Sequence, residues 1–212
     1  NRWIAAWLSA GEGYEACYDS SFSGGLRPGD SVWDVGANVG YYTRLFARRV
    51  REQGHIFAFE PSPTNFQRLA TACTELRNVT LLPCGLGRED GKLRFQQGAD
   101  ALGATSRITE SASDGINVDI RSGASLLASG EVTLPNAIKI DVEGFELEVL
   151  EGMADSLRQP PLRMIGVEVH FGILQQRGMA LVPQQIESLL QLSGFVVSWP
   201  DGSHILAVRA TV

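Results

Sequence analysis

Residues 32–43 read VWDVGANVGYYT, a short apolar run that passes through two glycines into an amphipathic segment. This pattern predicts a buried strand, a tight turn and the start of a helix. In a sheet covered by helices, ligands bind beyond the carboxyl ends of the strands, and a glycine turn lets a ligand approach the backbone N–H groups of the helix that follows. We therefore expect a ligand site at this turn.

The composition of the turn discriminates between ligands. A dinucleotide fingerprint has the form GxGxxG, but counting from Gly36 its second and third glycine positions hold Asn38 and Tyr41. Asp34, two residues before the first glycine, would repel a pyrophosphate and could accept a hydrogen bond from a cationic amino group. The turn therefore favours a nucleoside that carries an amino acid as the ligand. The alternative is that the ligand is a nicotinamide dinucleotide and the protein an oxidoreductase.

Outward from this turn, short apolar runs alternate with amphipathic ones, which is typical of a parallel sheet with helices on both faces, an α/β fold. Strands are expected over residues 31–35, 55–60, 79–84, 137–141, 163–170, 195–199 and 205–209. Helices are expected over residues 40–51, 63–77, 122–129, 145–156 and 183–192. The segment 194–206 predicts a closing antiparallel hairpin.

Two regions depart from the alternation. Residues 1–30 are interpreted as an N-terminal helix, with Trp3 and Trp7 on one stripe, followed by a docking segment and turn. Residues 88–117 contain a hairpin strand at 92–95 and then a long polar run, which is either a lid or a surface excursion. Residues 31–212 form the main domain, and the chain is expected to be a single domain overall.

The composition excludes several classes of protein. The 212 residues hold 24 acidic and 18 basic side chains, a formal net charge of −6, which argues against nucleic acid as a partner. The apolar runs are far shorter than the ~20 residues that span a bilayer, and no basic-then-apolar leader opens the chain. We expect no membrane span and a cytoplasmic location. Three cysteines, Cys17, Cys73 and Cys84, form no CxxC pair and are expected to be small buried hydrophobes.

A second motif, FAFEP at residues 57–61, ends a strand in a carboxylate. Glu60 could accept hydrogen bonds from both hydroxyls of a ribose, and Pro61 stops the strand. The alternative for Glu60 is a solvated acid at a strand end.

A third motif, IKIDVEGFE at residues 138–146, delivers acidic side chains after a strand. Period two places Lys139 and Asp141 on one face, and in VEVH, residues 167–170, it places Glu168 and His170 on one face. If the two strands are neighbours, Lys139 should pair with Glu168 inside the sheet. Asp141 and His170 should then emerge together at its carboxyl edge, as the rim of an active site.

His170 is the candidate general base, because the ordinary pKa of histidine lies near working pH. A structural histidine is the alternative, and His55 and His204 are expected to be structural. Carboxylates with one imidazole could hold Mg²⁺ or Mn²⁺. The residues concerned are Asp141, Glu143, Glu168 and His170. Without a tight ligand spacing, the expectation is that the chain has no metal site.

Taken together, residues 34–43, 59–66, 138–152 and 168–170 resemble the FkbM family of S-adenosylmethionine-dependent methyltransferases. The resemblance implies a Rossmann-like class I methyltransferase: a seven-stranded, mostly parallel sheet with an antiparallel last strand. It also implies S-adenosylmethionine as the cofactor and a small-molecule acceptor, a hydroxyl of a sugar, polyketide or other natural-product scaffold, methylated by in-line displacement.

The same resemblance assigns site residues. The cofactor would be lined by Asp34, Gly36, Asn38, Gly40, Thr43, Glu60, Pro61 and Asp141. The catalytic residues would be His170, Asp141 and Glu143. The alternative function is a non-catalytic module that binds a nucleoside or a partner on the same fold.

Overall fold

A seven-stranded sheet forms the centre of the computed structural model, which describes residues 16–96, 107–108 and 115–210. Its strand order is β10-β11-β9-β8-β1-β2-β3. The strands are β1 (Ser31–Val35), β2 (His55–Phe59), β3 (Val79–Leu82), β8 (Ala137–Ile140), β9 (Met164–Glu168), β10 (Phe195–Ser198) and β11 (His204–Arg209). The pairs that β11 forms with β9 and β10 are antiparallel, and the other pairs of this sheet are parallel. The expected α/β class and antiparallel last strand are confirmed.

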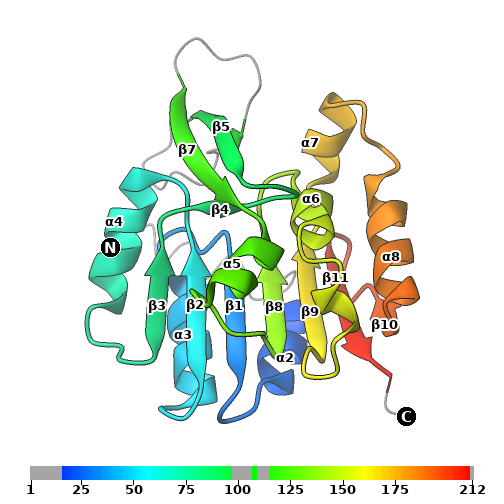
Figure 1. Cartoon of the computed structure of the whole chain (residues 1–212). Coiled ribbons are helices and arrows are strands. Elements are labelled where there is room, and N and C mark those ends of the chain that lie inside the picture. The colour runs from blue at the N-terminus through cyan, green and yellow to red at the C-terminus, as the bar shows by residue number, and fades with distance from the viewer. Residues whose placement is uncertain (1–15, 97–106, 109–114, 211–212) are drawn as a thin grey trace.

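Helices cover both faces of this sheet, and Figure 1 shows α5 and α6 in front of it and α2 and α3 behind it. One face carries α5 (Gly123–Ser129), α6 (Glu146–Glu151) and α8 (Val182–Leu192). The other carries α2 (Ala16–Gly25), α3 (Tyr41–Val50) and α4 (Pro63–Cys73). Successive residues of β1 point to opposite faces of the sheet. Trp33 packs in the core beneath α5, α6 and α8, and Val32 packs in the core on the other face.

The expected boundaries hold to within a few residues, with two larger differences. The helix expected over residues 145–156 is split into α6 and a 3₁₀ turn, Ser156–Arg158. At Gly152 an added Cβ would lie 1.9 Å from the carbonyl oxygen of Gly87, so the chain here is pressed against another loop and the helix ends. A short helix that was not expected, α7 (Phe171–Gln176), follows β9 directly.

The N-terminal segment differs from its prediction. The helix expected around Trp3 and Trp7 lies outside the described residues, and α2 forms where the composition indicated a turn. Tyr18 and Phe22, one helical turn apart, are both buried against the sheet, so tertiary packing outweighs the weak helix propensity of the glycine and serine residues. Cys73 and Cys84 are buried as expected, but the expectation was wrong for Cys17, which is exposed.

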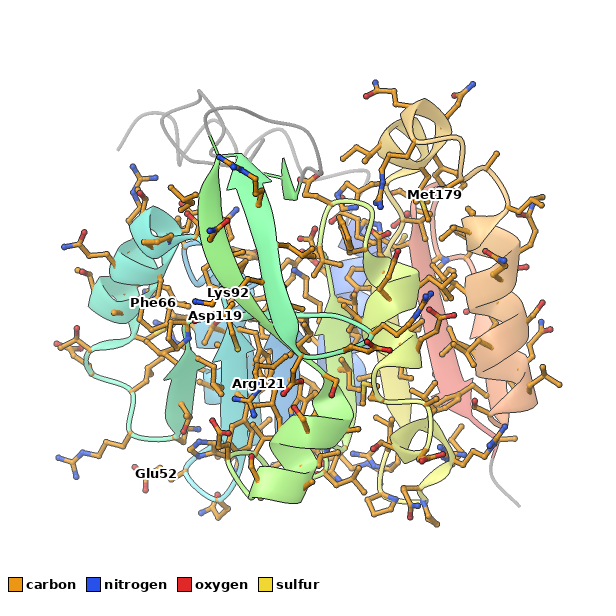
Figure 2. All side chains as sticks on the ribbon, turned by 45° about the horizontal axis from the view of Figure 1, so that its top comes forward. Glu52, Phe66, Lys92, Asp119, Arg121 and Met179 are labelled. Atoms are coloured by element: carbon orange, nitrogen blue, oxygen red, sulfur yellow. The ribbon has the colours of Figure 1, made fainter. Side chains whose placement is uncertain are left out.

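A second, small sheet stands beyond the ends of the parallel strands (Figure 1). Its order is β4 (Gly85–Leu86), β7 (Ile116–Arg121), β5 (Gly91–Gln96) and β6 (Arg107–Ile108). Lys92 on β5 faces Asp119 on β7 at 3.3 Å, and Figure 2 shows the two side chains together on this sheet. The strand expected at 92–95 is confirmed, whereas its partner β7 was missed. Most of the expected lid lies outside the described residues.

No described helix combines the length and the apolar character that crossing a bilayer requires.

Candidate active site

The turn after β1 is built from unusual backbone conformations. Gly36, Asn38 and Gly40 have φ values of +81°, +51° and +89°. A Cβ on Gly36 would lie 1.8 Å from the carbonyl oxygen of Asp141, so no larger residue fits there. The turn therefore touches the chain where it leaves β8.

The N–H groups of this turn are largely used within the protein. Gly36 and Ala37 donate to the carbonyl of Phe59 at 3.1 and 3.0 Å, and Asn38 donates to Oε2 of Glu60 at 2.8 Å. A pyrophosphate would need such donors free. The geometry thus agrees with the sequence argument against a dinucleotide.

Glu60 follows β2 and joins the two strand ends. Its Oε1 accepts from the N–H of Ser62 at 2.8 Å while Oε2 accepts from Asn38. Burial raises the pKa of Glu60 to about 7, against the lowering effect of these two hydrogen bonds. Pro61 is half-buried beside it and ends the strand.

Asp34 is fully buried beneath the turn. Its Oδ2 accepts from the hydroxyl of Thr43 at 2.6 Å, and its Oδ1 has no partner among the described residues, nor has Oδ1 of Asn38. Burial raises the pKa of Asp34, although the charge of Lys139 opposes the rise. Thr43 is itself fully buried, so the hydrogen bond between it and Asp34 is shielded from water.

The three residues expected to be catalytic come together at the ends of β8 and β9. Nε2 of His170 lies 3.6 Å from Oδ1 of Asp141, 3.5 Å from Oε2 of Glu143 and 3.9 Å from Oε1 of Glu168. Glu143 adopts φ +54°, a conformation uncommon for a residue with a side chain. We call Asp141, Glu143, Glu168 and His170 the acidic rim.

The imidazole of His170 is held by Glu146, a residue of the motif at 138–146 for which the sequence predicted no role. Nδ1 of His170 lies 2.7 Å from Oε1 of this fully buried carboxyl. Burial lowers the pKa of His170, but the hydrogen bond to Glu146 and the charges of Glu143 and Asp141 outweigh it and raise the pKa to about 9. The imidazole therefore carries a proton at neutral pH, which differs from the expectation of a base with an ordinary pKa.

The expected Lys139–Glu168 pair is wrong. Nζ of Lys139 is 2.9 Å from Oδ2 of Asp141, whereas Glu168 meets Nε2 of His204 at 3.7 Å. The register explains this, since Lys139 lies opposite Gly166 on β9 and Glu168 lies opposite His204 on β11. Burial works against the charges of Lys139 and Asp141, but their attraction outweighs it: the pKa of Asp141 is lowered and that of Lys139 is raised.

The other two histidines differ in their distance from the site. His55, at the amino end of β2, contacts the hydroxyl of Thr80 at 2.8 Å and lies away from the rim, as expected. His204 is closer than expected, because it contacts Glu168 and also Asp201, at 2.9 Å.

A cation could bind at the rim. Asp141, Glu168 and His170 can each offer one ligand atom, and these atoms lie within 4.8 Å of one another. The folded arrangement supports the metal alternative that the sequence left open.

Comparisons with known proteins find a family and several relatives. The model of the FkbM methyltransferase domain matches residues 34–199. Hexuronic acid methyltransferase AglP of Haloferax volcanii is 36% identical over 146 residues, which cover 68% of this chain and 57% of that protein. The chain thus spans less than two thirds of that relative. 31-O-demethyl-FK506 methyltransferase FkbM of Streptomyces tacrolimicus is 28% identical over 200 residues, 76% of each chain.

Solved structures show a similar fold. Precorrin-6y C5,15-methyltransferase from Geobacter metallireducens superposes with a TM-score of 0.56 at 14% identity, over 92% of this chain and 88% of that one. Aeropyrum pernix fibrillarin, solved with natively bound S-adenosyl-L-methionine, gives a TM-score of 0.53 at 13% identity, over 86% and 67% of the two chains.

Proposed function

We propose that this chain, which belongs to the FkbM family of S-adenosylmethionine-dependent methyltransferases, transfers a methyl group to a hydroxyl of a small-molecule acceptor. The family match confirms the identification made from the sequence and S-adenosylmethionine as the cofactor. The observation that carries the proposal is the contact of Gly36 with the backbone of Asp141. It brings a turn suited to a nucleoside against a rim of acids and one imidazole, so donor and acceptor would share one space.

The residues of the turn fit the cofactor. Two buried oxygens, Oδ1 of Asp34 and Oδ1 of Asn38, find no partner within the described part of the chain and are acceptors that an amino group could satisfy. We propose that Glu60, at the end of β2, accepts from ribose hydroxyls in addition to the two backbone N–H groups that it already binds. The remaining members of the proposed set act on the shape of the turn: Gly36 and Gly40 by their backbone, Thr43 through Asp34, and Pro61 by ending the strand.

The chemistry expected of the protein is mainly alignment. S-adenosylmethionine supplies a sulfonium methyl that leaves by in-line displacement. Holding two reactants in line can lower the barrier by about 7–11 kcal/mol. We propose that His170, Asp141 and Glu143 border the acceptor oxygen, where the carboxylates favour the loss of its proton.

The names of two relatives support the acceptor class. One is named for a hexuronic acid and the other for a 31-O-demethyl compound, which suggests a hydroxyl of a sugar or another natural-product scaffold. A hollow of about 200 Å³ lies between the small sheet and the start of α6, with Leu93, Phe145 and Glu148 in its lining. It is the proposed place for part of the acceptor.

Transfer from ¹³C-methyl-labelled S-adenosylmethionine to a panel of sugars, uronic acids and polyketides tests the proposal. We expect a new methyl signal bonded to oxygen in the NMR spectrum of a product. Replacing His170 by Gln should lower kcat by about 10²-fold, because a side chain that borders the acceptor oxygen no longer aligns it, and should leave cofactor affinity nearly unchanged. The control Asp119→Asn, on the small sheet, should keep full activity.

Methylation at nitrogen or carbon would contradict the proposed reaction. Cofactor binding without transfer to any acceptor would instead favour a non-catalytic nucleoside-binding module. Loss of only a few-fold in kcat for His170→Gln would remove that residue from the catalytic set.

A further inference from the structure

We propose that Asp141, Glu168 and His170 form a site for one divalent cation of the Mn²⁺ or Mg²⁺ class. Each side chain offers one ligand atom, and the three atoms lie within 4.8 Å of one another. Nε2 of His170 is 3.6 Å from Oδ1 of Asp141 and 3.9 Å from Oε1 of Glu168. Two carboxylate oxygens and one imidazole are a donor set suited to Mn²⁺, with further positions open for water.

The imidazole is oriented as a ligand would be. Nδ1 of His170 contacts Oε1 of Glu146 at 2.7 Å, and that oxygen also accepts from the N–H of Gly144 at 2.8 Å. Metal-binding histidines usually donate their second ring N–H to a carboxylate, which presents the lone pair of the other nitrogen to the metal. Here the nitrogen presented is Nε2, which faces Asp141, Glu143 and Glu168, and a bound cation would take the place of the proton that this nitrogen carries in the metal-free protein.

Both carboxylates are held in the same manner. Oδ2 of Asp141 is bound by Lys139 at 2.9 Å, and Oε2 of Glu168 lies 3.7 Å from His204. Lys139 and His204 are buried. Each of the three proposed ligands therefore has one atom beside a different buried residue, and the remaining atoms, Oδ1, Oε1 and Nε2, are the ones that lie near one another.

A buried hydroxyl beneath the rim provides an independent indication. Tyr18 is 1% exposed, and its hydroxyl has no partner among the described residues. The hydroxyl lies against β9, where a Cβ on Gly166 would be 2.1 Å from it, and Gly166 shares a face with Glu168. The ring of Tyr18 also stacks on that of His204, the neighbour of Glu168, with the two centroids 4.2 Å apart, so this side chain lies beside the rim. A water molecule bound to the cation would supply the missing partner.

The site is accessible and negatively charged. The side chains of Asp141, Glu168 and His170 are 27%, 29% and 15% exposed, so an ion can enter and keep open positions. Glu143 adds a further carboxylate 3.5 Å from His170.

The role of the ion rests on the proposed function. An acceptor hydroxyl in an open position would be oriented by the cation and would have its pKa lowered. The C–O bond then forms as the C–S bond breaks, the electron pair of that bond remains on sulfur, and the hydroxyl proton leaves to water.

The test measures Mn²⁺ binding to the full chain without cofactor or acceptor. Titration followed by electron paramagnetic resonance should show one Mn²⁺ per chain. Electron spin-echo spectroscopy should detect one ¹⁴N coupling that changes when the histidines are labelled with ¹⁵N. The coupling should vanish in His170→Gln, and Glu146→Gln should weaken binding by about 10- to 100-fold. The control Asp119→Asn should bind as the wild type does.

Absence of stoichiometric Mn²⁺ binding, or binding without nitrogen coupling in the wild type, would overturn the site, and neither result depends on a variant that folds. If the protein binds no Mn²⁺ but still transfers methyl groups, the cation site is rejected and the proposed function is retained. If the protein binds Mn²⁺ but transfers no methyl group, the cation site is retained and the proposed function is rejected.

Discussion

The glycine turn at residues 36–40 and the acidic rim touch one another, yet they are built by different means. The turn owes its shape to backbone conformation, with three positive φ values and N–H groups bonded to Phe59 and Glu60. The rim owes its shape to charge, since each of its groups is held by another ionisable side chain. Adding an atom to the turn should therefore destabilise the protein by steric overlap. Removing a charge at the rim should destabilise it by leaving another charge without its partner.

The largest effect is expected from Gly36→Ala. A Cβ placed 1.8 Å from the carbonyl oxygen of Asp141 meets backbone, which cannot move aside as a flexible side chain could. Together with the positive φ, this should lower the free energy of unfolding by about 5 kcal/mol. It should also abolish binding of S-adenosylhomocysteine. Urea unfolding and calorimetry measure the two effects.

Gly29→Ala is the matched control. Gly29 also has a positive φ, +91°, but an added Cβ would meet nothing within 4 Å. Its substitution should lower the free energy of unfolding by only about 1 kcal/mol, which isolates the contribution of φ. Equal losses in the two variants would show that close approach of the turn to the rim is unimportant.

Next comes the removal of a charge beneath the rim. Lys139→Met leaves the carboxylates of Asp34 and Asp141 without their cation and should lower the free energy of unfolding by about 3–5 kcal/mol. Lys92→Met is the control, since Lys92 pairs with Asp119 on the surface, where the two side chains are 70% and 61% exposed. Lys92→Met should lower the free energy of unfolding by less than about 1 kcal/mol. Similar losses of stability in Lys139→Met and Lys92→Met would contradict the distinction between a buried and an exposed ion pair.

The pH dependence of stability should reveal Glu60. Its pKa is about 7 in the folded protein against an ordinary 4.5, so its contribution to stability is fully present below pH 4.5 and is lost as pH rises through 7. The loss amounts to about 3 kcal/mol. We would measure the free energy of unfolding of the cofactor-free wild type and of Glu60→Gln between pH 4.5 and 8. As the pH rises, the wild type should lose stability relative to the variant. A difference independent of pH would contradict the raised pKa.

The smallest effect is expected from Tyr18→Phe. The substitution removes a buried hydroxyl that has no partner in the ranges the structure describes, so the metal-free protein should be unchanged or more stable by up to about 1 kcal/mol. Thermal unfolding with and without Mn²⁺ measures it. Destabilisation of the metal-free protein would show that the hydroxyl has a partner already.

Much of the fold could be predicted from the sequence, because hydrophobic periodicity is local. All seven strands of the main sheet were placed, and so was the antiparallel end. The helix α2 was missed because its glycine and serine residues have weak helix propensity and it depends on distant packing: Tyr18 packs on β9 through the space at Gly166. The strand β7, INVDIR, does carry the alternation typical of a strand, so it could have been predicted from the sequence.

The candidate site could be predicted in part. The meeting of Asp141 with His170 followed from period two and neighbouring strands, and the structure shows it. The partner of Lys139 was assigned wrongly, because the assignment depended on register, and Glu146 was given no role, because a buried acid at a helix start has many ordinary uses.

The sequence by itself determined the sheet with its glycine turn, because backbone conformation and side-chain alternation are properties of adjacent residues. Only the tertiary structure decided which charges meet, because Lys139, Glu146, Glu168 and His204 come from separate elements whose order and register the local pattern does not contain.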